Sequence, residues 1–105
     1  MPKALRRAAI VAPVRTPVAR FLGALAQVPV ETLAATVVRE VMARTGIDPM
    51  LVEDIVFAQS YASGETPCVG RWAGLAAGLP IEVPGMQLDR RCGGGLTAVT
   101  TAAMM

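Results

Sequence analysis

The residue best suited to chemistry is Cys92, which three glycines follow directly: Gly93, Gly94 and Gly95. The segment reads as a short strand, a tight turn and the opening of a helix, so the sulfur lies near unpaired N–H groups and the positive end of the helix dipole. That position favours the thiolate, the nucleophilic form of cysteine. The glycines permit backbone dihedrals that a Cβ forbids, and their N–H groups are natural donors to an oxyanion. The plain alternative is a small buried cysteine without chemistry.

Three runs of sequence share a pattern with one known family. Residues 89–99 read Asp-Arg-Arg-Cys-Gly-Gly-Gly-Leu-Thr-Ala-Val, residues 14–17 read Val-Arg-Thr-Pro, and residues 77–80 read Ala-Gly-Leu-Pro. In their order along the chain, 14–17, then 77–80, then 89–99, they resemble the thiolases, the acetyl-CoA acetyltransferases and 3-ketoacyl-CoA thiolases, whose active-site segment is similar to residues 89–99. Gly94 stands where serine is frequent in that family. The resemblance extends from Ile10 to the last helix.

The resemblance implies that residues 1–105 are the N-terminal part of a thiolase N-terminal domain, ending in the helix after Cys92. It implies that Cys92 accepts an acyl group from acyl-CoA, that coenzyme A thioesters are substrates, and that no cofactor or metal is bound. The family's reaction condenses two acyl-CoA molecules or cleaves 3-ketoacyl-CoA. Its histidine base and second cysteine come from later segments, and this chain has no histidine. We therefore expect the 105-residue chain alone to be inactive.

Two other functions stay open at this point. Gly93, Gly95 and Ala98 satisfy the G-x-G-x-x-A pattern of dinucleotide-binding sites between a strand and a helix. That pattern usually follows the first strand of a fold, whereas here it follows the third predicted one. A thiolase-like protein without catalysis, used as a lipid carrier, is the second alternative. A hydrolase elbow is disfavoured because it needs glycine at position 90, which is Arg90.

Three predicted strands and three predicted helices position Cys92. Apolar residues recur at every third or fourth position in residues 30–45, and Gly46 follows this segment. This pattern predicts an amphipathic helix with a glycine cap. Asp48 and Pro49 predict a short helical turn with the aspartate as N-cap. The predicted strands are 8–14, 54–59 and 85–89, and the predicted helices are 30–45, 67–78 and 96–105. The order β-α-β-α-β-α predicts an α/β layered fold, a mixed sheet with helices packed on it.

The last two predicted helices carry specific expectations. In the helix at 67–78 we expect Val69, Trp72, Ala73 and Ala76 on the buried side, with small residues allowing close packing. Arg71 on this helix either reaches solvent or, by the resemblance, is a structural arginine. A mostly apolar face of the last helix, which no later element covers, is formed by Leu96, Val99, Thr100 and Ala103. We expect that face to be exposed and the isolated chain to associate.

Composition excludes several classes of function. The net charge is +2 and aromatic residues make up 4% of the chain, so we predict no nucleic-acid partner. The two cysteines, Cys68 and Cys92, do not make a disulfide framework, and we interpret Cys68 as structural. No apolar run reaches the roughly 18 residues of a membrane helix, so we predict no membrane partner. We expect a cytoplasmic protein, and the resemblance implies a homodimer or homotetramer at full length.

Overall fold

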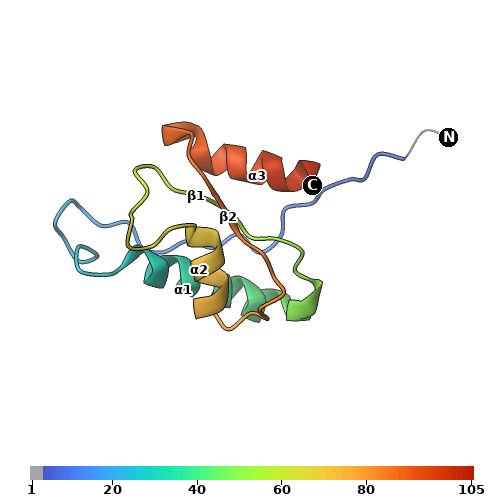
Figure 1. The fold of residues 1–105 in the computed structure, drawn as a ribbon, viewed down its shortest axis with the longest axis horizontal. Coiled ribbons are helices and arrows are strands. Elements are labelled where there is room, and N and C mark those ends of the chain that lie inside the picture. Colours follow the sequence, from blue (N-terminus) through green and yellow to red (C-terminus); the bar gives the residue numbers. More distant parts are fainter. Residues whose placement is uncertain (1–3) are drawn as a thin grey trace.

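The computed structural model describes residues 4–105 and places a two-stranded sheet between helices (Figure 1). Helices α1 and α2 lie on one side of the strands and α3 lies on the other. The α/β class that the element order predicts is confirmed. In chain order the elements are α1 (Val30–Thr45), the 3-10 helix η1 (Pro49–Leu51), β1 (Val56–Ala58), α2 (Val69–Ala76), β2 (Met86–Leu88), the 3-10 helix η2 (Arg91–Gly93) and α3 (Gly94–Met104).

Helix α1 has the bounds that the apolar periodicity predicts. Gly46 ends it in the left-handed conformation, with φ of 62°, and its N–H donates to the carbonyl of Met42. The side chain of Asp48 then accepts the N–H of Met50 at 3.0 Å and caps η1, as predicted. The buried face of α1 includes Ala34, which packs with residues of α2 in one apolar cluster. Local pattern and capping residues therefore determine this part of the chain.

The sheet pairs β1 and β2 in parallel, with Val56 opposite Met86 and Ala58 opposite Leu88. The N–H of Met86 extends the ladder by donating to the carbonyl of Ile55 at 2.8 Å. Both strands are shorter than predicted, because only the residues that pair form strand. At the end of β2 the chain enters the turn that carries the candidate nucleophile.

The strand predicted at residues 8–14 is wrong. This segment is irregular, and the side chains of Ile10 and Val11 are 80% and 68% exposed. A strand buried on both faces needs neighbours for its N–H and C=O groups, and within residues 4–105 the only paired strands are β1 and β2. An apolar run of this length is therefore insufficient evidence for a strand. The described sheet is parallel and two-stranded rather than mixed and three-stranded.

Helix α2 lies directly against the strands, because its buried face is made of small residues. A Cβ on Gly70 would lie 2.8 Å from the carbonyl oxygen of Ile55, a separation that real Cβ atoms do not adopt. Val69 and Ala73 are buried as predicted, but Trp72 is 45% exposed and Ala76 is also exposed. The prediction for these two residues is wrong. The space between the helix and the sheet is too narrow for the large side chain of Trp72, and Ala76 is the last residue of the helix.

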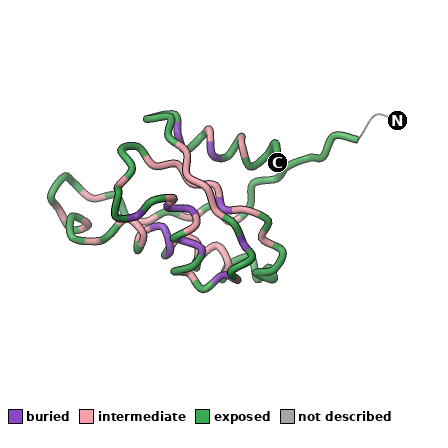
Figure 2. The backbone as a smooth tube through the Cα atoms, viewed as in Figure 1, coloured by how far each residue is buried: buried purple, intermediate pink, exposed green. Residues whose placement is uncertain are grey.

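Helix α3 covers the opposite side of β1 and begins two residues earlier than predicted. Gly94 and Ala98 are its buried residues. Leu96 and Val99 are 72% and 47% exposed, which confirms the expected uncovered face of this helix. Figure 2 shows the contrast between the buried segments on the α1 and α2 side and the mostly exposed α3.

Candidate active site

Cys92 is the middle residue of η2, the turn that joins β2 to α3, and it is exposed. The turn is closed by the N–H of Gly93, which donates to the carbonyl of Arg90 at 3.0 Å. The N–H of Gly94 donates to the carbonyl of Arg91. The predicted place of the cysteine between a strand and a helix is confirmed. Two of the predicted oxyanion donors are engaged in this turn, so their role toward a substrate stays a prediction.

The glycines after the cysteine act differently from the expectation. Gly93 has φ of −88° and Gly94 has φ of −60°, values that any residue adopts. The left-handed conformation is instead at Arg91, with φ of 47°. Gly94 is required for space, because a Cβ there would lie 2.9 Å from the Cβ of Ala58 in β1. Around a Cβ on Gly95, in contrast, the described chain has no heavy atom within 4 Å apart from the adjacent residues and the backbone of the same helix.

An ionic cluster that the sequence interpretation missed lies just before Cys92. The carboxylate of Asp89 accepts the backbone N–H of Arg91 at 2.9 Å and also pairs with the Arg91 guanidinium. The bond from this N–H, together with the charge of the guanidinium, holds the pKa of Asp89 below its ordinary value of 3.8. The guanidinium lies 4.6 Å from the centre of the Tyr61 ring. The charge of Arg91 is therefore directed to Asp89 and Tyr61, and the signal that could have revealed this is the aspartate two residues before it.

Cys68 and Arg71 have structural surroundings at the start of α2. Cys68 precedes this helix with φ of 56°, and its Sγ donates to the carbonyl of Gly85 at 3.2 Å. The guanidinium of Arg71 donates to the carbonyl of Val83, so the alternative in which it only reaches solvent is wrong. Both side chains tie α2 to the segment that enters β2.

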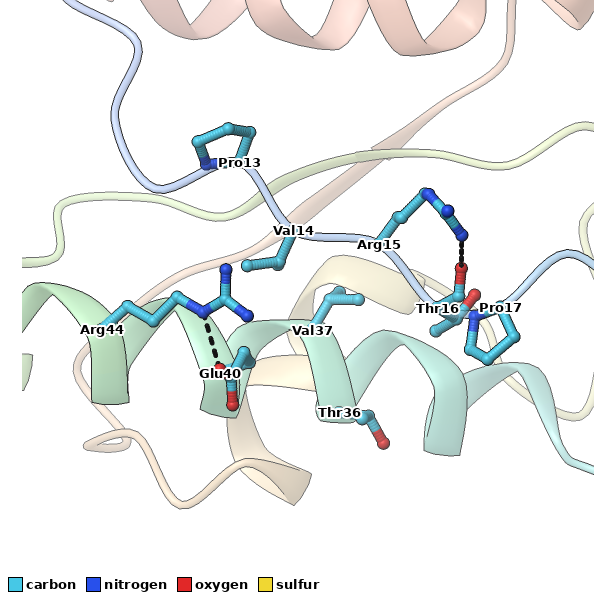
Figure 3. Close-up of a pocket in the computed structure, with 9 residues that line it drawn as sticks. All are labelled: Pro13, Val14, Arg15, Thr16, Pro17, Thr36, Val37, Glu40 and Arg44. Atoms are coloured by element: carbon cyan, nitrogen blue, oxygen red, sulfur yellow. Dashed lines mark hydrogen bonds and ion pairs between the residues drawn. The ribbon is translucent and has the colours of Figure 1, made fainter.

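The Val-Arg-Thr-Pro run at 14–17 lies along α1 (Figure 3). Arg15 points away from the helix and donates to the carbonyl of Thr16 at 3.1 Å, while Arg44 and Glu40 on α1 pair at 2.7 Å. The cavity between the run and the helix measures about 570 Å³ and is lined by Pro13, Val14, Arg15, Thr16, Pro17, Thr36, Val37, Glu40 and Arg44. The structure therefore leaves Cys92 outside this cavity.

Neither a metal cluster nor a membrane helix is present in the described part of the chain. Residues 4–105 contain no group of three or more histidine, cysteine, aspartate or glutamate side chains placed to hold a metal ion. None of the helices in this range combines the length and the hydropathy needed to cross a bilayer.

Comparison with known proteins decides the family. Residues 8–105 match the family described as "Thiolase, N-terminal domain". The chain belongs to the thiolase family. The matched range includes η2 and therefore Cys92, so the resemblance seen in the three sequence runs is confirmed. Thiolase membership also favours a thiolase interpretation of Gly93 and Gly95 over dinucleotide binding. The glycine that the packing requires is Gly94, which lies against the Cβ of Ala58 and occupies a free position in the dinucleotide pattern.

The thiolase relatives are longer proteins. The chain is 39% identical to the acetyl-CoA acetyltransferase of Pseudomonas aeruginosa over 94 residues, which are 90% of this chain and 24% of that protein. It is 40% identical to a 3-ketoacyl-CoA thiolase of Vibrio cholerae over 97 residues, 92% of this chain and 22% of the relative. The crystal structure of the Bacillus anthracis acetyl-CoA acetyltransferase superposes with a TM-score of 0.83 at 35% identity, covering 87% of this chain and 23% of the other. The chain thus spans about a quarter of the length of these relatives.

Proposed function

We propose that this chain supplies the acyl-accepting cysteine of an acetyl-CoA C-acyltransferase. The observation that carries the proposal is an exposed Cys92 on the turn between β2 and α3, inside the range that matches the thiolase N-terminal domain. Relatives named acetyl-CoA acetyltransferase and 3-ketoacyl-CoA thiolase support the reaction class. The proposed substrates are acyl-CoA thioesters.

In the proposed reaction the thiolate of Cys92 attacks the carbonyl carbon of an acyl-CoA. The tetrahedral intermediate collapses, the thiolate of coenzyme A leaves, and the acyl group remains on Cys92 as a thioester. A second acetyl-CoA, deprotonated at its α-carbon, then attacks this thioester and releases Cys92 with a 3-ketoacyl-CoA as product. The reverse sequence cleaves 3-ketoacyl-CoA. A cysteine suits both directions, because it is a good nucleophile and a good leaving group.

The 105 residues contain no histidine, so the base expected for this chemistry is not among them. We therefore propose that the chain alone takes up an acyl group slowly and does not complete turnovers. A homodimer or homotetramer in the cytoplasm belongs to the same proposal for the full-length protein and follows from the thiolase resemblance.

The test is to incubate the 105-residue chain with acetyl-CoA and to map acetylated residues by mass spectrometry. We expect one acetyl group per chain on Cys92, lost in Cys92→Ser and retained in the matched control Cys68→Ser. Tight binding of acyl-CoA without any thioester would contradict the proposal and favour a lipid carrier. Sustained cleavage of acetoacetyl-CoA by this chain, lost in Cys92→Ser, would show that the reaction needs fewer groups than proposed.

A further inference from the structure

Asp89 lies between the end of β2 and the turn that carries Cys92. Its carboxylate has two partners in Arg91: the backbone N–H, at 2.9 Å from Oδ1, and the guanidinium. The side chain of Asp89 is 36% exposed and that of Arg91 is 59% exposed. An ion pair with this exposure contributes little to stability by itself. The effect of Asp89 on the shape of the backbone is therefore the more important one.

Arg91 adopts a conformation that a side chain disfavours. Its φ of 47° is in the left-handed region, where the Cβ of a residue other than glycine crowds the backbone. Aspartate relieves this strain by accepting the N–H two residues on, as Asp89 does here. Because Arg91 directly precedes Cys92, its dihedral angles determine the direction in which the chain enters η2. Strained residues of this kind are characteristic of functional turns.

The same cluster joins the two loops that follow the parallel strands. Asp89 comes directly after Leu88, the last residue of β2, and Tyr61 follows Ala58, the last residue of β1, by a short loop. The Arg91 guanidinium lies 4.6 Å from the Tyr61 ring centre and so bridges the loops. The carboxyl ends of parallel strands are where α/β proteins place their reactive groups.

We infer that Asp89 is a positioning residue, which holds Arg91 in the left-handed conformation and so presents the thiol of Cys92. The inference rests on the proposed function of Cys92, since a cysteine without chemistry has no need of a defined presentation. It assigns no contact between Asp89 and a substrate. The hydrogen bond to the Arg91 N–H sets the geometry, and the Tyr61 contact fixes the loop on the other side.

The experiment compares the rate of Cys92 acetylation by acetyl-CoA, and of its alkylation by iodoacetamide, in four single variants and one double variant of the 105-residue chain. Asp89→Ala removes the acceptor and should lower both rates about tenfold, the population change that strain of this kind produces. Asp89→Asn keeps an Oδ1 acceptor without the charge and should stay within about twofold of the wild type. Asp48→Ala is the matched control, because Asp48 makes the same bond to the N–H of Met50 on the segment after α1. That variant should leave both rates unchanged.

The fourth variant separates positioning from a loss of fold. Arg91→Gly removes the strain, because glycine adopts positive φ freely. Adding Asp89→Ala to Arg91→Gly should therefore lower the rates less than twofold, whereas the same change in the wild type lowers them about tenfold. Circular dichroism and urea titration of each variant establish that the compared chains are folded.

Each outcome decides the inference. Equal rates for the wild type and a folded Asp89→Ala variant would overturn it. A rise of both rates in Asp89→Asn would also overturn it, because the carboxylate would then act through its charge. If Asp89→Ala does not fold, the effect of Asp89→Ala in the Arg91→Gly background decides, and a tenfold loss there would refute positioning. A wild type that is alkylated but never acetylated would refute the proposed function while the alkylation rates still test Asp89.

Discussion

Because α3 packs closely on β1, we predict that alanine substitutions at two adjacent glycines of α3 change the stability of the fold in opposite directions. A Cβ on Gly94 would lie 2.9 Å from the Cβ of Ala58, whereas a Cβ on Gly95 would meet no heavy atom of the described chain within 4 Å beyond the adjacent residues and the backbone of α3. Both residues are in the first turn of α3 and neither has positive φ. The same substitution, glycine to alanine, therefore tests packing at one position and backbone entropy alone at the next.

The expected magnitudes follow from this difference. Carbon atoms prefer separations of about 3.5–4.0 Å, so alanine at 94 must push α3 away from β1. Overpacking of this kind costs about 1–3 kcal/mol, and the gain from replacing glycine offsets about 0.4–1 kcal/mol of it. We expect Gly94→Ala to lower the free energy of unfolding by about 1 kcal/mol. Gly95→Ala meets no such crowding and keeps only the stabilisation from replacing glycine, so it should raise the free energy of unfolding by about 0.4–1 kcal/mol.

Urea unfolding followed by circular dichroism measures both effects. With a slope of about 1.5 kcal/mol per molar urea, the two variants should differ in midpoint by about 1 M. The double variant Ala58→Gly with Gly94→Ala is the control, because it removes the Cβ that the new methyl group meets. Its urea midpoint should be higher than the value expected by adding the midpoint changes of the single variants Ala58→Gly and Gly94→Ala. Equal midpoints for Gly94→Ala and Gly95→Ala, or no coupling to Ala58, would refute the close contact between α3 and β1.

Three further predictions concern ionisable and reactive groups. Because the pKa of Asp89 in the folded chain is below 3.8, its charge stabilises the fold above that pH. The difference in urea midpoint between the wild type and Asp89→Asn should therefore be present near pH 7 and vanish as the pH falls below 3.8; a difference independent of pH would contradict it. Cys92 is exposed and Cys68 is half-buried, so iodoacetamide should label Cys92 faster near neutral pH, and mass mapping that finds the reverse order would be decisive against this. Arg71→Met leaves the carbonyl of Val83 without its donor and should destabilise the chain by about 1–3 kcal/mol in urea titration, an effect that a solvent-exposed arginine would not show.

Local sequence signals predicted much of the helical part of this fold. The segment at 30–45 has helical periodicity, a glycine cap and a following Asp-Pro turn, and each of these acts through residues a few positions apart. The segment at 8–14 shows the limit of that approach. Its apolar run is compatible with a strand, but strand formation depends on a partner elsewhere in the chain, which periodicity does not reveal.

In the candidate site, too, the features that depend on neighbouring residues were predicted from the sequence, and those that depend on distant residues were not. Cys92 was identified because the residues around it are contiguous and resemble a thiolase segment, and its place between β2 and α3 follows from local order. The role of Gly94 depends on Ala58, a residue of a distant strand, so the sequence did not distinguish it from its neighbours. The strained residue was expected among the glycines and is Arg91, because Asp89 stabilises a conformation that side chains usually avoid.

The parallel pairing of β1 and β2 also determines when the candidate site can form during folding. Parallel neighbours cannot be joined by a tight hairpin, so Val56 meets Met86 only after the long connection through α2 has closed, with the loss of chain entropy that such closure entails. Helix α1, which depends on local contacts, can form much earlier. The turn with Cys92 follows β2 directly and acquires its geometry only once this non-local step is complete. A newly made chain therefore keeps its candidate nucleophile in an undefined conformation until the sheet has assembled.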